Sequence, residues 1–264
     1  MSDQKLATNA LHAGHDVTAN GGARAVPIYQ TTSYVFNNSD HAANLFSLQE
    51  LGFIYTRLNN PTNQILQDRL AAVEGGIGAV VFASGTAAIA TGLLTLLKSG
   101  DHIVASSSLY GGTYNLLSVT LPRFGITTTF VDASNPDNFK DAVQDNTRAF
   151  FVESLGNPKL DVLDLEAIAE HSKTAEVPFI VDNTVATPVL LNPIKHGANI
   201  VIHSLTKYIG GQGTSLGGAI IDAGTFNWAN GKFPEFTEPS AGYHGLKYHE
   251  VLGAASYTFK LILE

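Results

Sequence analysis

Short apolar runs alternate with stretches of helical periodicity over most of the chain, and this alternation constrains the fold more than any other feature. Strands and helices that alternate in this way form a mostly parallel sheet with helices on both faces. We therefore predict an α/β fold, a three-layer sandwich whose ligands gather at the carboxyl ends of the strands. The expected strands are residues 79–84, 101–108, 126–131, 147–153, 177–182, 200–202 and 216–222, and the expected helices are residues 61–73, 85–97, 136–143 and 165–173.

A single lysine, Lys207, follows the expected strand at residues 200–202. Burying an ammonium group without a partner is costly, and desolvation favours the neutral amine that a nucleophilic lysine needs. Most lysines in loops are solvated surface charges, but this one comes after two hydroxyl residues, Ser204 and Thr206, and before glycines at positions 210, 211 and 213. Glycine amides can approach an anion closely. Together these groups indicate pyridoxal phosphate bound to the lysine amine.

Polar residues at three other expected strand ends each allow two interpretations. Ser84, Gly85 and Thr86 open a helix, where they form either an anion site or an ordinary serine cap. Asp182 ends an apolar strand, so it requires a cation or hydrogen-bond donors, unless it only caps a helix or an Asx turn. Tyr110 precedes paired glycines and is either a turn residue or a flat apolar face for a ligand ring.

The segment Ser204-Leu-Thr-Lys207-Tyr-Ile-Gly-Gly-Gln-Gly-Thr214 resembles the lysine signature of the Cys/Met-metabolism enzymes that depend on pyridoxal phosphate. That family includes cystathionine γ-synthase, the γ-lyases and O-acetylhomoserine sulfhydrylase. Further motifs of the family follow in the same order along nearly the whole chain. Residues 226–245, with their Phe-Pro and Tyr-His-Gly elements, are similar to a segment of the acetylhomoserine sulfhydrylase branch, although in isolation they suggest a polar, aromatic surface loop.

The resemblance implies roles for individual residues. Lys207 would bind the cofactor and move protons, Asp182 would pair with the protonated pyridine nitrogen, and Tyr110 would stack on the ring and relay a proton to the leaving group. The phosphate would be held by the backbone amides of Gly85 and Thr86, and by Tyr55 and Arg57 of a neighbouring subunit. The other cofactor-binding residues that the resemblance implies are Ser84, Asn157, Thr184, Ser204 and Thr206.

Three parts of the chain are expected from this comparison. Residues 1–60 would form an extended arm with little helix that contributes to the partner subunit's site, and residues 61–245 would form the large cofactor-binding domain. Residues 246–264 would begin a connecting helix to a C-terminal domain. Family members carry in that domain the arginine that binds the substrate carboxylate, so we expect a chain that lacks half of its substrate site.

Charge and composition exclude several classes of protein. The 264 residues carry a formal net charge of −8 without a basic tract, which argues against a nucleic-acid partner. Cysteine is absent, so disulfides and thiolate metal sites are excluded. His12 and His15 have a metal-like spacing, but nothing nearby completes a ligand set, and we predict no metal. The sequence shows no membrane-length apolar run and no secretory signal, so we expect a cytoplasmic protein.

The predicted activity is a γ-replacement on an amino-acid substrate. O-acetylhomoserine and sulfide, or methanethiol, would give homocysteine, or methionine, and acetate. A γ-lyase or cystathionine γ-synthase on the same framework, and an inactive module that only binds pyridoxal phosphate, remain open alternatives. Because the tyrosine–arginine pair reaches across a subunit interface in the family, we expect a homodimer or homotetramer.

Overall fold

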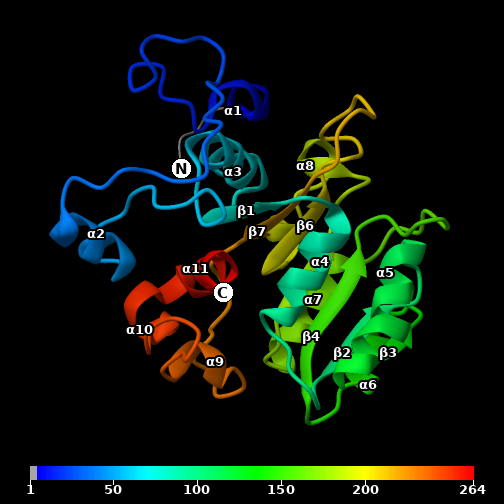
Figure 1. Cartoon of the computed structure of the whole chain (residues 1–264). Helices are drawn as coiled ribbons and strands as arrows, with labels where there is room; N and C mark the ends of the chain where they lie inside the picture. Colours follow the sequence, from blue (N-terminus) through cyan, green and yellow to red (C-terminus); the bar gives the residue numbers. More distant parts are fainter. Residues whose placement is uncertain (1–4) are drawn as a thin grey trace.

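The computed structural model of the chain describes residues 5–264, and at its centre lies one seven-stranded sheet (Figure 1). The strand order is β1-β7-β6-β5-β4-β2-β3. Strands β2 to β6 pair in parallel, whereas β7 runs antiparallel to both β6 and β1. The mostly parallel sheet that the sequence predicts is therefore confirmed. The strands are β1 Gly78–Phe82, β2 His102–Ser106, β3 Thr127–Val131, β4 Thr147–Glu153, β5 Phe179–Asp182, β6 Ile200–Ser204 and β7 Gly218–Asp222.

Both faces of the sheet are buried, and the central strands show why. In β4, Ala149 and Phe151 belong to one apolar cluster and Phe150 and Val152 to the other, and all four side chains are fully buried. A strand with two dry faces must be apolar at every position, which explains the continuous apolar runs of the sequence. The result is a three-layer sandwich.

Different helices cover the two faces. One cluster joins the sheet to α4, η1, η2 and the C-terminal helices α9 to α11, and the other joins it to α3, α6 and α7. The helices of the arm and of the first cluster are α1 Leu6–His12, α2 Ser39–Phe46, α4 Gly85–Leu94, α5 Gly111–Asn115, the π-helix η1 Leu116–Thr120, the 3₁₀ turn η2 Leu121–Phe124, α9 Pro234–Thr237, α10 Tyr248–Leu252, the 3₁₀ turn η4 Gly253–Ala255 and α11 Ser256–Leu263. The remaining helices are α3 Pro61–Glu74, α6 Asp137–Asp141, α7 Leu165–Thr174, α8 Thr187–Leu190 and the 3₁₀ turn η3 Pro193–His196.

The N-terminal arm is less extended than the sequence suggests. It carries two short helices, α1 and α2, and Figure 1 shows that its remaining length runs as an irregular chain beside α3. Helix α2 begins where the side chain of Asn38 accepts a hydrogen bond from the amide of His41, a local capping contact that hydrophobic periodicity does not reveal.

The C-terminal third of the chain covers one face of the sheet. Residues 226–245 differ from the surface loop that they suggest in isolation, because Trp228, Phe233 and Phe236 are almost completely buried and pack against Tyr257 and the sheet. Residues 246–264 contain two short helices, α10 and α11, with a break at Gly253, which has a positive φ of 53°. The aromatic residues that look like a surface loop are thus the cover of one sheet face.

None of the helices within residues 5–264 combines the length and the apolar character that crossing a membrane requires.

Candidate active site

A cavity of about 480 Å³ opens at the carboxyl ends of the parallel strands. It collects ten of the sequence-predicted site residues from five separate segments of the chain. These are Ser84, Gly85, Thr86, Tyr110, Asn157, Asp182, Thr184, Ser204, Thr206 and Lys207. The segments meet because parallel strands end at the same edge of a sheet, where the doubly wound architecture leaves room for a ligand.

The amino end of helix α4 forms one wall of the cavity. Ser84 is the N-cap residue, and its hydroxyl accepts a hydrogen bond of 3.1 Å from the amide of Ala87. The serine cap and the anion site are therefore not alternatives, because the first backbone amides of a helix have no partner within the helix. A side chain at Gly85 would place its Cβ 2.7 Å from the Cβ of Ser204. Only glycine thus lets α4 approach the end of β6.

Asp182 lies on the cavity floor, where it is 8% exposed. Its Oδ1 accepts hydrogen bonds from the Thr184 amide at 3.0 Å and the Thr184 hydroxyl at 2.6 Å. The hydroxyl oxygen of Thr184 in turn accepts a bond of 2.8 Å from the amide of Ser204. Burial raises the pKa of the Asp182 carboxyl, while the bonds from Thr184 lower it. Within residues 5–264 no cationic side chain forms a salt bridge with Asp182, so this carboxyl suits a cationic ligand group.

Lys207 lines the same cavity from the loop that connects β6 to β7. The chain turns sharply there, with hydrogen bonds from the Gly210 amide to the Leu205 carbonyl at 2.9 Å and from the Gly211 amide to the Lys207 carbonyl at 2.8 Å. The side chain of Lys207 is exposed in the single chain. The prediction that Lys207 is desolvated because it follows a buried strand is therefore wrong. The lysine belongs to the loop at the cavity mouth rather than to the strand.

Glu153, at the end of β4, is a cavity residue that the sequence analysis missed. It is 5% exposed, and its two oxygens accept backbone hydrogen bonds from Tyr110 at 2.6 Å and from Asn157 at 3.1 Å. Burial, and then the charge of the neighbouring Asp182, raises the pKa of the Glu153 carboxyl to about 8. Its position at the end of an apolar strand is the same signal that singled out Asp182, and it could have found Glu153.

A second layer of polar side chains lies behind the cavity, on the other face of the sheet. Ser154 donates to Asn183 at 2.8 Å, Asn183 donates to Glu74 at 3.2 Å, and Nε2 of His203 lies 2.5 Å from the same Glu74 oxygen. All four side chains are at most 2% exposed. Because side chains alternate along a strand, three of these residues are direct sequence neighbours of cavity residues: Ser154 follows Glu153, Asn183 follows Asp182 and His203 precedes Ser204. The fourth, Glu74, comes from the end of α3.

Tyr55 and Arg57 do not line this cavity. Both are exposed on the N-terminal arm, and Tyr55 forms an isolated bridge with Ser33. The single chain therefore does not bring them together with the other predicted site residues.

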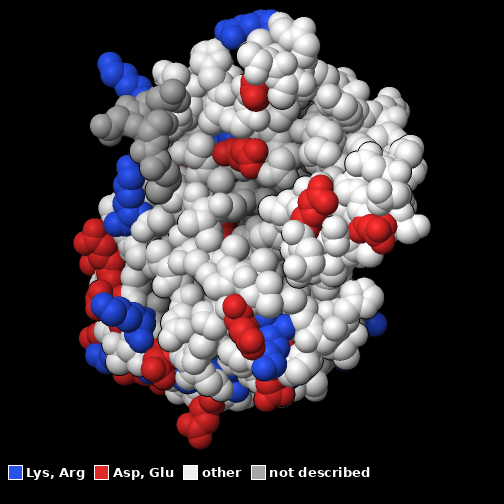
Figure 2. All heavy atoms as spheres, turned by 90° about the vertical axis from the view of Figure 1, so that its left-hand side faces the viewer, with Lys and Arg blue, Asp and Glu red and all other residues white. Residues whose placement is uncertain are grey.

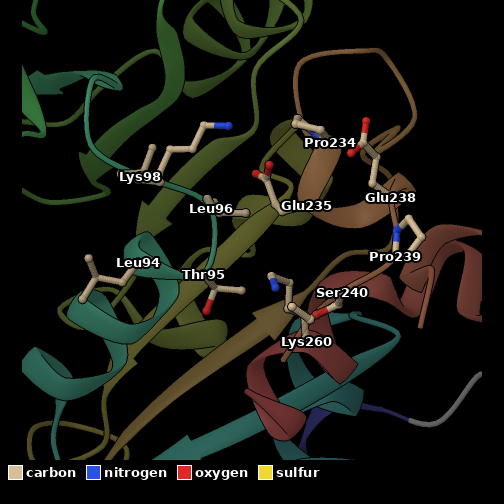
Figure 3. A pocket seen from close by; sticks show the side chains of 12 residues that line it. Leu94, Thr95, Leu96, Lys98, Pro234, Glu235, Glu238, Pro239, Ser240 and Lys260 are labelled. Atoms are coloured by element: carbon tan, nitrogen blue, oxygen red, sulfur yellow. The ribbon is translucent and has the colours of Figure 1, made fainter. Parts of the chain in front are cut away.

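A second cavity, of about 440 Å³, lies between the end of α4 and the C-terminal helices (Figure 3). Lys98, Glu235, Glu238 and Lys260 point toward it from opposite sides. The most buried of these, Lys260, is already paired with Glu264 and lies over the ring of Tyr248. The charged side chains around this second cavity are of both signs, and none of the predicted site residues lines it. The second cavity is therefore not the catalytic centre.

The chemistry of the first cavity fits pyridoxal phosphate. A phosphate requires free amides, which the start of α4 offers, and Gly85 keeps that position open. A pyridinium nitrogen requires a buried anion, and Asp182 is a buried carboxyl held by two donors. An aldehyde requires an accessible amine, and Lys207 is exposed at the cavity mouth. Fold and cavity together fit the class of pyridoxal phosphate proteins of the α/β sandwich type.

Comparison with known proteins agrees with this class. The model of the family described as Cys/Met metabolism PLP-dependent enzymes matches residues 7–245, and the chain belongs to this family. It is 58% identical over 249 residues to the O-acetyl-L-homoserine sulfhydrylase of Leptospira meyeri, with 94% of this chain and 56% of the relative covered. It is 50% identical over 262 residues to the homocysteine synthase of Schizosaccharomyces pombe, with 98% of this chain and 61% of that relative covered. The chain thus spans about three fifths of the length of these curated relatives.

A crystal structure from Campylobacter jejuni, assigned as an O-acetylhomoserine (thiol)-lyase, resembles this chain with a TM-score of 0.89 and 41% identity. The similarity covers 99% of this chain and 70% of that one, and the Campylobacter protein contains an N'-pyridoxyl-lysine-5'-monophosphate residue. The predicted family and fold class are therefore confirmed.

Proposed function

We propose that the chain binds pyridoxal phosphate on Lys207, and that the protein to which it belongs is a γ-replacement transferase. The substrates would be O-acetyl-L-homoserine and sulfide or methanethiol, and the products homocysteine or methionine and acetate. The observation that carries this proposal is the convergence of Lys207, Asp182 and the start of α4 on one cavity. The names of the relatives, which are O-acetylhomoserine sulfhydrylases and homocysteine synthases, support the choice of substrate.

Each side of the cavity has its own binding task in this proposal. The amides of Gly85 and Thr86 bind the phosphate, assisted by the hydroxyls of Ser84, Ser204 and Thr206. Asp182 holds the proton of the ring nitrogen, and Thr184 orients Asp182 through two hydrogen bonds. Asn157 contacts the ring oxygen from the loop after β4, and Tyr110 covers the ring face.

When bound, the cofactor supplies an electron sink that stabilises a negative charge at the substrate Cα. The free amine of Lys207 takes the Cα proton and then moves a proton off Cβ, because the acetate on Cγ can leave only with the electrons of a Cβ–H bond. After sulfide or the thiol adds at Cγ, the same amine returns protons to Cβ and Cα. The phenol of Tyr110 gives its proton to the departing acetate. Ile89, Leu155 and Leu160 line the same cavity and limit the access of water.

We also propose a homo-oligomer in which residues 1–60 form the interface arm, residues 61–245 the cofactor domain and residues 246–264 a connecting segment. The arm exposes apolar side chains, with Ile28 82%, Val35 96% and Leu51 76% exposed. Figure 2 shows that charged side chains are sparse over the middle of the face on that side of the molecule. Exposed apolar surface of this kind marks an interaction site, and in a second copy it would bring Tyr55 and Arg57 to the neighbouring phosphate.

The first experiment tests the covalent attachment. We expect borohydride reduction of the chain with pyridoxal phosphate to label Lys207, and peptide mapping to find the label there. Lys207→Ala should lose the label, whereas Lys195→Ala, which removes an exposed lysine outside the cavity, should keep it. A label that persists in Lys207→Ala would refute the proposed site.

The second experiment tests the reaction on the longest protein that the gene encodes. With O-acetylhomoserine, sulfide and cofactor, we expect acetate and homocysteine in equal amounts. Ammonia and a 2-keto acid instead would identify a γ-lyase, and cofactor binding without turnover would indicate a module that only binds. Either of these outcomes would reject the transferase assignment while leaving the lysine site intact.

A further inference from the structure

Glu153 connects two loops that follow neighbouring strands and line the cavity. One carboxyl oxygen accepts a hydrogen bond from the backbone amide of Tyr110, the N-cap residue of α5. The other oxygen accepts a hydrogen bond from the backbone amide of Asn157, in the loop after β4. Both bonds go to backbone rather than to side chains, so they fix the position of each loop without occupying the groups that face the ligand. A buried side chain with both oxygens bonded in this way has a defined orientation.

Glu153 also shares the cavity floor with a second carboxyl. Strands β4 and β5 pair in parallel register with Glu153 opposite Asp182, so the two side chains leave the same face of the sheet. Two neighbouring buried carboxyls do not ionise together at neutral pH. Thr184 gives Asp182 a side-chain donor in addition to an amide, whereas Glu153 has backbone donors alone. Asp182 is therefore the better anion, and the shared proton belongs on Glu153.

We propose that Glu153 is a positioning residue, which sets the spacing between the Tyr110 and Asn157 loops and holds the proton of the Glu153–Asp182 pair. This inference rests on the proposed cofactor site, because it assigns Asp182 the charge that a ring nitrogen requires. Tyr110 and Asn157 then reach the ring from fixed backbone positions. Three other titratable groups, Tyr110, Lys207 and Tyr208, line the cavity. Two more act from nearby: the charge of Asp161 also raises the pKa of Glu153, and His203 lowers the pKa of Asp182.

The two hydrogen bonds from backbone amides to Glu153 give a signal that does not depend on the cofactor. Hydrogen bonds to an ionised carboxylate are shorter and stronger than those to a neutral carboxyl. In the cofactor-free chain, the amide resonances of Tyr110 and Asn157 should therefore shift together as Glu153 ionises, with a common midpoint near its pKa of about 8. The amide of Ala87, which donates to the neutral hydroxyl of Ser84, serves as the control and should not follow this midpoint.

Variants separate a positioning role from simple packing. Glu153→Gln keeps the shape of the side chain but offers only one acceptor oxygen, so the common titration should disappear. Glu153→Asp keeps the charge but is too short to reach both loops, so at most one of the two amides should still titrate. Two independent titrations in the native chain, or a common titration that survives in Glu153→Gln, would overturn the proposal.

Cofactor affinity provides the second measurement. We expect Glu153→Ala to weaken pyridoxal phosphate binding about tenfold, since two hydrogen bonds from backbone amides are lost. The control Glu166→Gln, at an exposed position on α7, should bind as the native chain does. An unchanged affinity in Glu153→Ala would overturn the positioning role. If the native chain itself does not bind the cofactor, the proposed function fails, and the amide titration still decides the role of Glu153.

Discussion

The buried contact between Glu74 and His203 offers a direct test of how the layer behind the cavity stabilises the fold. The two atoms lie 2.5 Å apart and both side chains are completely buried. His203→Leu removes one of the two hydrogen-bond partners of the buried Glu74 carboxyl and leaves Asn183 as the other. Leaving a buried polar group without a partner costs about 1–3 kcal/mol, and more for a charged group. We therefore expect His203→Leu to reduce the free energy of unfolding by about 3 kcal/mol, at the upper end of that range.

The chain contains a matched control for this substitution. His196 contacts Glu166 at 3.0 Å, but the two side chains are 38% and 73% exposed. An exposed pair of this kind contributes roughly 0–1 kcal/mol, so His196→Leu should have little effect. Urea unfolding of the cofactor-free chain, followed by circular dichroism, measures both values.

A double substitution completes the test. Replacing both members of a buried hydrogen-bonded pair with apolar residues is often nearly neutral, because neither partner is left unsatisfied. We expect Glu74→Met combined with His203→Leu to be more stable than His203→Leu alone. The single variant Glu74→Met is measured as well. Equal costs for His203→Leu and His196→Leu, or a double variant whose loss equals the sum of the losses in Glu74→Met and His203→Leu, would refute the reasoning.

Two further predictions follow from the carboxyl environments. Thr184→Val removes the hydroxyl donor to Asp182, and loss of a hydrogen bond to a charged group should weaken pyridoxal phosphate binding about tenfold. An absorbance titration measures the affinity, with Thr174→Val, on the exposed side of α7, as the control. An unchanged affinity in Thr184→Val would contradict the prediction. Burial raises the pKa of Asp222 from 3.8 to about 6, so the folded chain holds this proton longer than the unfolded chain, and stability should fall as pH rises through that range. The Asp222→Asn variant should lose this component, which is at most about 3 kcal/mol, in urea unfolding at pH 4 and pH 7, and an identical pH dependence in both proteins would exclude it.

The sequence predicted the sheet well because neither face of its central strands is exposed to solvent. The expected strands at residues 147–153 and 177–182 contain the unbroken apolar stretches 149–152 and 177–181, and they match β4 and β5 closely. The reversed direction of β7 was not predicted, since an apolar run carries no information on strand polarity. The burial of Trp228 and its aromatic neighbours was also missed, because their spacing follows neither a helix nor a strand.

The candidate site was predictable where a residue type is unusual for its position. Lys207 and Asp182 are charged residues next to apolar strands, and both line the cavity. The pairing of Glu74 with His203 could not be predicted, because 129 residues separate the two in sequence. The exposure of Lys207 was likewise not predictable, as it depends on the path of the loop after β6. The individual roles of these residues in binding the cofactor stay predictions.

The antiparallel pairing of β6 with β7 has a consequence for how Lys207 can move. Ser204 pairs with Gly218 across the two strands, so both stems of the connecting segment 205–217 are anchored at the same edge of the sheet. Thr206 joins the two ends of the segment a second time, because its hydroxyl accepts a hydrogen bond from the Gly217 amide at 3.2 Å and donates one to the Gly217 carbonyl at 3.3 Å. A rearrangement confined to the residues between these ends, Lys207 included, leaves the β6–β7 ladder intact. Local openings of this size require far less free energy than unfolding of the sheet.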